Sequence, residues 1–118
     1  MKPVSDHSDK LAEVFDNDLR ISVAYLFGSK SRGLNMSESD IDIAVLLSEL
    51  PEKMLDYYLD LIERISRELG EAVDLVVLNT APPILKHQVI KFGKVLYRRD
   101  EKVRVEFEAK AEKEYFDL

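Results

Sequence analysis

The chain has 118 residues, a formal net charge of -6, 46% hydrophobic residues and no cysteine. Its length suits one domain with a hydrophobic core, and the lack of cysteine excludes disulfide scaffolds, thiolate metal sites and cysteine nucleophiles. The acidic balance disfavours broad binding to nucleic acid, which needs clustered lysine and arginine, and no apolar run reaches the about 20 residues that cross a bilayer.

Helical and strand-like patterns alternate along the chain, beginning with an amphipathic helix. Apolar residues at helical spacing predict this helix over residues 8–19. Residues 20–27 alternate as a strand does, which puts Ile21 and the other odd-numbered residues on one face. Gly28 ends that pattern, and the polar residues 30–39 are expected to form a loop or a short helix plus a loop.

A second strand and a long helix follow. Residues 40–47 predict a strand with Ile41 and the other odd-numbered residues on one face and the even-numbered residues on the other. Pro51 opens a strongly amphipathic helix that continues to about Leu69. Gly70 is a natural stop for this helix.

The last third of the chain predicts two shorter strands and two helices. Strands are expected over residues 73–78 and 94–98, with a helix over residues 82–91 between them. A charged terminal helix from residue 100 carries only a thin apolar stripe. Such a stripe fits either a solvated helix or a helix that docks on a partner.

This order of elements predicts an α+β fold. We expect one domain over residues 1–118, with a short mixed sheet, helices packed mainly on one side and the site at the open edge of the sheet. The N-terminal residues lack the apolar stretch of a signal peptide. We therefore expect a cytoplasmic protein that does not act at a membrane.

Two acidic residues open the second predicted strand. Asp40 and Asp42 are two residues apart, so both side chains project from the same face. Neighbouring carboxylates repel each other, and the surrounding residues are apolar. A divalent cation between them would remove the cost, and carboxylate oxygens suit Mg²⁺ together with substrate phosphates.

A phosphate-binding turn precedes this pair. Gly28 follows a strand directly and lets the backbone approach a ligand closely. The Ser29 hydroxyl and the amides after it can donate to phosphate oxygens, and Arg32 can add a charge-assisted contact. The segment does not fit the P-loop pattern, because no Gly-Lys-Ser/Thr follows at the required spacing.

Asp74 is a third acidic residue, inside the apolar strand 73–78. If that strand lies beside residues 40–47, Asp74 faces the same metal site. Three carboxylates and two Mg²⁺ ions can support in-line nucleotidyl transfer, in which Asp74 would either bind the second ion or act as general base. Taken alone, each carboxylate also fits a simpler structural role, as a turn cap or a solvated strand position.

The combined motif resembles the signature of the polymerase-β-like nucleotidyltransferase superfamily. Gly28-Ser29 is followed by ten residues and then by Asp40-Ile41-Asp42. The surrounding residues, together with residues 81–97, look like the small minimal nucleotidyltransferase (MNT) proteins, which pair with HEPN-domain proteins in prokaryotes. The likeness covers about residues 14–99.

The resemblance implies an antitoxin that transfers AMP from ATP to a tyrosine of a HEPN ribonuclease toxin. By position, Asp40, Asp42 and Asp74 would be the metal-binding catalytic residues, while Gly28 and Ser29 would hold the triphosphate. Arg32 matches the usual basic position of the loop, whereas Lys30 and Ser31 stand where small residues are common.

The resemblance also bears on partners and on an alternative function. Larger superfamily members carry an added helical domain for the acceptor, so this chain needs a partner or a second copy, as a hetero- or homo-oligomer. The alternative is a non-catalytic antitoxin that neutralises the toxin by covering it. A purely binding protein has no physical need for three mutually repelling carboxylates, which favours the enzyme.

Overall fold

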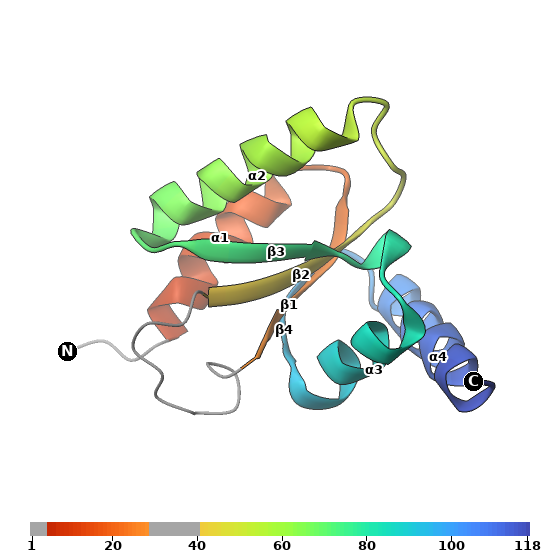
Figure 1. Ribbon diagram of the computed structural model, residues 1–118. Helices are drawn as coiled ribbons and strands as arrows, with labels where there is room; N and C mark the ends of the chain where they lie inside the picture. The colour runs from red at the N-terminus through yellow and green to blue at the C-terminus, as the bar shows by residue number, and fades with distance from the viewer. Residues whose placement is uncertain (1–4, 29–40) are drawn as a thin grey trace.

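A computed structural model describes residues 5–28 and 41–118 of the chain. Helices are interspersed with strands over this range, as Figure 1 shows. In chain order they are α1 (Ser5–Asp16), β1 (Ile21–Phe27), β2 (Ile41–Leu47), α2 (Met54–Leu69), β3 (Val73–Val77), the 3-10 turn η1 (Leu78–Thr80), α3 (Pro83–Phe92), β4 (Lys94–Arg98) and α4 (Glu101–Phe116).

The four described strands form one mixed sheet in the order β3-β2-β1-β4. β1 runs antiparallel to both β2 and β4, and β2 runs parallel to β3. A parallel pair needs a long crossover, which α2 supplies here. The α+β class and the short mixed sheet expected from the sequence are therefore confirmed.

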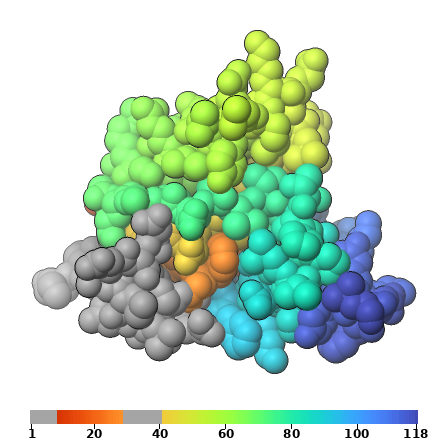
Figure 2. Space-filling view, viewed as in Figure 1, coloured from red at the N-terminus to blue at the C-terminus, as the bar shows by residue number. Residues whose placement is uncertain are grey.

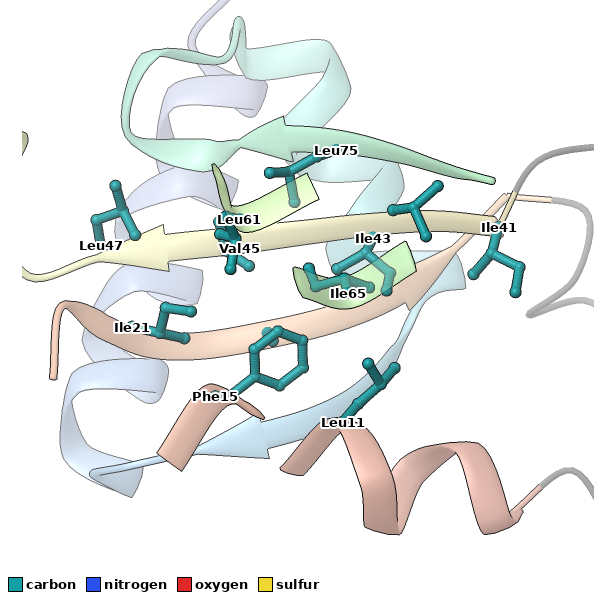
Figure 3. Close-up of a cluster of buried hydrophobic side chains, with 12 residues drawn as sticks. Leu11, Phe15, Ile21, Ile41, Ile43, Val45, Leu47, Leu61, Ile65 and Leu75 are labelled. Atoms are coloured by element: carbon teal, nitrogen blue, oxygen red, sulfur yellow. The ribbon is translucent and has the colours of Figure 1, made fainter. Parts of the chain in front are cut away.

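Two hydrophobic clusters lie on opposite faces of the sheet. The larger one joins α1 and α2 to the sheet through buried Phe15, Leu61 and Ile65 (Figure 3). The smaller one joins the other face to α3 and α4 through Val89 and Phe107. The expectation that helices pack mainly on one side was wrong in this detail, because β1 and β2 are apolar on both faces and both need cover.

A register shift in β1 changes which residues share a face. The pairing with β2 is irregular between Ile21 and Val23. Such an irregularity reverses the alternation of side chains beyond it. Ile21 consequently packs in the larger cluster with Ala24, whereas Val23 and Tyr25 pack in the smaller one. The prediction that Ile21 shares a face with Val23 was wrong for this reason.

The helix ends follow local chemistry. α2 begins at Met54, three residues after the predicted start at Pro51, and ends at Gly70, whose φ is +71°. The side chain of Asp100 accepts a hydrogen bond from the backbone amide of Lys102 and caps α4.

The terminal helix α4 is not free of the domain. It packs along α3 and reaches β1, where the Tyr25 hydroxyl donates a 2.8 Å hydrogen bond to Glu108. Ala111 is fully covered by this packing, while Phe116 at the helix end stays 75% exposed. No helix within the described part of the chain is both long and apolar enough to cross a membrane.

Candidate active site

Asp42 and Asp74 lie side by side on adjacent strands. Asp42 of β2 and Asp74 of β3 are direct partners in the parallel register, and neighbouring strands lie about 4.8 Å apart. Asp42 is half-buried and Asp74 is exposed on the edge strand. Because their flanking residues Ile43 and Leu75 point into the larger core, both carboxylates lie on the opposite face, beside α3.

Gly28 lies next to the Asp42 carboxylate, directly after a third strand, β1. Phe27, the last residue of β1, is the register partner of Asp42, and Gly28 follows it with a φ of +81°. A Cβ added at Gly28 would lie 2.1 Å from Asp42 Oδ2 and 2.9 Å from Asp42 Cγ. Glycine is therefore required here for its left-handed backbone and for the room it leaves to the Asp42 carboxylate.

The register that pairs Asp42 with Asp74 is held by two hydrogen bonds of one side chain. Asn79, in the turn after β3, donates from its amide nitrogen to the Leu47 carbonyl at 2.8 Å. Its amide oxygen accepts from the Leu47 backbone nitrogen at 2.9 Å. The Tyr58 hydroxyl of α2 also donates to the Leu75 carbonyl at 2.9 Å. Together these bonds fix β3 against β2 and α2.

Sequence reasoning missed Asn79 and Tyr58 as positioning residues. Asn79 carried a weak signal, since an asparagine directly after a strand often bonds to nearby backbone. Tyr58 lies in the amphipathic helix expected after Pro51, and its ring packs against the larger core cluster.

Three of the predicted site residues, Ser29, Arg32 and Asp40, lie outside the described residues. Within the described ranges, no group of three or more acidic, histidine or cysteine side chains could hold a metal. The described pair nevertheless fits a hard divalent cation, because two aligned carboxylates supply the oxygen ligands that such a cation prefers.

Several described groups away from this site have perturbed pKa values. At the opposite end of the sheet, burial raises the pKa of Asp18, but hydrogen bonds from Arg64 and Tyr57 outweigh it and lower the pKa below 3.8. Burial and the bond to Glu108 raise the pKa of Tyr25. These groups hold helices against the sheet, so their chemistry is structural.

Comparisons with known proteins identify the family of the chain. A family model described as polymerase beta, nucleotidyltransferase, matches residues 9–102. The chain belongs to this nucleotidyltransferase family. Membership confirms the resemblance seen in the sequence, and it implies a nucleotide substrate and usually a divalent metal.

Similar proteins include known toxin–antitoxin components. The protein adenylyltransferase MntA of Shewanella oneidensis is 38% identical over 82 residues, which are 70% of this chain and 58% of that protein. This chain therefore spans less than two thirds of that relative's length.

Two solved structures are similar over nearly the whole chain. One, a toxin–antitoxin with AMP-PNP, has a TM-score of 0.78 at 30% identity and covers 94% of this chain and 88% of the matched chain. The other, a tri-AMPylated Shewanella oneidensis HEPN toxin in complex with an MNT antitoxin, has a TM-score of 0.75 at 30% identity, with coverages of 97% and 87%.

Proposed function

We propose that this protein is an antitoxin that transfers AMP from ATP to a tyrosine hydroxyl of a HEPN-domain ribonuclease toxin and thereby silences it. One observation carries the proposal: Asp42 and Asp74 are register partners on one face, beside a glycine whose missing side chain leaves room for the Asp42 carboxylate. Family membership supports nucleotidyl transfer, and the similar proteins named above supply the type of acceptor.

The reaction is a substitution at the α-phosphorus of ATP. The tyrosine oxygen forms a bond to phosphorus, the bond to the bridging oxygen breaks, and pyrophosphate leaves. Asp40, Asp42 and Asp74 would hold two Mg²⁺ ions, and these would supply charge neutralisation for the triphosphate and favour loss of the proton from the attacking hydroxyl.

The chain's own residues bind and orient the nucleotide. Gly28 lets the backbone approach the triphosphate, while Ser29 and Arg32 donate to its oxygens. Asp74, exposed on the edge strand, is open to an acceptor brought by a partner, and it either completes the metal site or takes the proton of the tyrosine hydroxyl.

The test is label transfer to the HEPN-domain protein proposed as the partner. The complex is incubated with radiolabelled ATP and Mg²⁺ and compared with the Asp42→Asn/Asp74→Asn double variant. Asp60→Asn is a matched control, because Asp60 is an exposed carboxylate on α2, on the other side of the sheet.

We expect label on the partner with the wild type and with Asp60→Asn, and none with the double variant. Ribonuclease assays on the same samples distinguish the alternative. If the double variant neutralises the toxin as fully as the wild type does, and neither transfers label, the protein acts by binding alone.

A further inference from the structure

A small pocket opens beside the acidic pair. Its volume is about 200 Å³ and it is lined by Phe27, Gly28, Gln88 and Phe92. Phe27 is the register partner of Asp42, so the pocket adjoins the proposed phosphate and metal site on the same face. In Figure 2 the end of β1, in orange, lies at the bottom of a hollow bordered by α3, in teal.

Close packing of α3 on β1 builds this pocket. A Cβ at Gly93, directly after α3, would lie 2.4 Å from the Val89 carbonyl oxygen and 3.0 Å from the Leu26 carbonyl oxygen. Val89 is fully buried in the smaller core. The helix end is therefore fixed, and its neighbouring residues Gln88 and Phe92 are held at the pocket wall.

The lining is suited to a flat, neutral ring. Gln88 is exposed and Phe92 is 44% exposed, and the Lys91 ammonium nitrogen lies 5.5 Å from the centroid of the Phe92 ring. Among the described residues that line it, none is charged, and Gln88 supplies a polar amide between two phenyl rings. The volume is also below the about 300–1,000 Å³ typical of pockets that enclose whole drug-sized ligands, so it suits a single ring system with the rest of the ligand outside.

We propose that this pocket binds the base of the transferred nucleotide and that Gln88 selects adenine. A side-chain amide offers one donor and one acceptor, which match the N7 acceptor and N6 donor of adenine, whereas guanine presents two acceptors at the same edge. The Phe92 ring supplies a surface on which the base stacks. This inference rests on the proposed function, because it places the base beside the triphosphate held at Gly28.

The test measures binding alone and needs no partner protein. The full chain is titrated by calorimetry in Mg²⁺ with AMP-PNP, GMP-PNP and tripolyphosphate, which has no base. The variants are Gln88→Ala and Phe92→Ala. Phe116→Ala is the matched control, because Phe116 is an exposed phenyl ring on α4 that does not line the pocket.

We expect Gln88→Ala to weaken AMP-PNP binding about tenfold and to reduce the preference over GMP-PNP by a similar factor. Phe92→Ala should weaken both nucleotides, since stacking is shared by all bases. Tripolyphosphate should bind the wild type and all variants equally.

Two results would overturn the inference in different ways. If the wild type binds AMP-PNP and both pocket variants bind it equally well, the base lies elsewhere while the transferase proposal stands. If the wild type binds neither AMP-PNP nor tripolyphosphate, the proposed function fails together with the base pocket.

Discussion

The substitution Gly28→Ala tests two reasons for a glycine after β1, the left-handed backbone and the room left for the Asp42 carboxylate. Gly28 and Gly70 both have left-handed backbones, with φ values of +81° and +71°. An alanine in this region costs about 1–2 kcal/mol. Both Gly28→Ala and Gly70→Ala should therefore lower the Tm by several degrees, about 3–8 °C for a domain of this size.

The two variants should differ in activity. Nothing lies within 4 Å of a Cβ at Gly70, whereas a Cβ at Gly28 would lie 2.1 Å from Asp42 Oδ2. The Asp42 carboxylate must then move by about 1 Å to restore an ordinary contact, and a displacement of about this size costs about 100-fold in rate. We expect kcat/KM for AMP transfer to fall about 100-fold in Gly28→Ala and to stay unchanged in Gly70→Ala.

The assay is initial-rate label transfer to the HEPN-domain partner at a temperature where circular dichroism shows both variants folded. Gly70→Ala controls for the backbone strain alone. Wild-type kcat/KM in Gly28→Ala, with a loss of Tm equal to that of Gly70→Ala, would refute the role assigned to the Asp42 carboxylate.

Three further predictions concern stability, each measured by urea denaturation. Gly93→Ala should lower the free energy of unfolding by about 1–3 kcal/mol, because its Cβ would meet two backbone carbonyl oxygens; unchanged stability would contradict the close packing. Tyr25→Phe should cost about 1 kcal/mol, because it removes the hydrogen bond to Glu108; a variant as stable as the wild type would show that this bond does not hold α4. Asp18, whose pKa is lowered below 3.8 by Arg64, stabilises the fold above that pH and loses this contribution as the pH falls through the folded-state pKa. The stability difference between wild type and Asp18→Asn should therefore be constant above about pH 5 and shrink toward pH 2, and a difference independent of pH would refute the assignment.

Most elements could be predicted because their apolar spacing is regular and their ends carry specific signals. Gly70 ends α2 as expected, and the fourth strand was predicted over residues 94–98, as found. The face of the sheet on which Ile21 lies could not be predicted. It depends on the register shift between Ile21 and Val23, which arises only when β1 pairs with β2. The start of α2 was misplaced because a proline marks a favourable start without fixing it.

The candidate site was predictable in composition but not in arrangement. Asp42 and Asp74 are unusual as carboxylates in apolar strands, which the sequence displays directly. Their pairing in the register depends on strand order, which the spacing of two distant segments does not determine. The hydrogen bonds of Asn79 to Leu47 and the pocket at Gln88 arise from tertiary packing. The periodicity of the sequence therefore does not predict them.

The crossover through α2 links the position of Asp74 to side chains that pack on the opposite face of the sheet. Leu61 and Ile65 of α2 pack against the face of the sheet opposite the two carboxylates, yet this packing sets where β3 lies. Random mutagenesis scored by toxin survival should accordingly recover inactivating substitutions along the inner stripe of that helix. Such variants would impair catalysis by letting Asp74 drift out of line with Asp42, at temperatures where the rest of the domain is still intact.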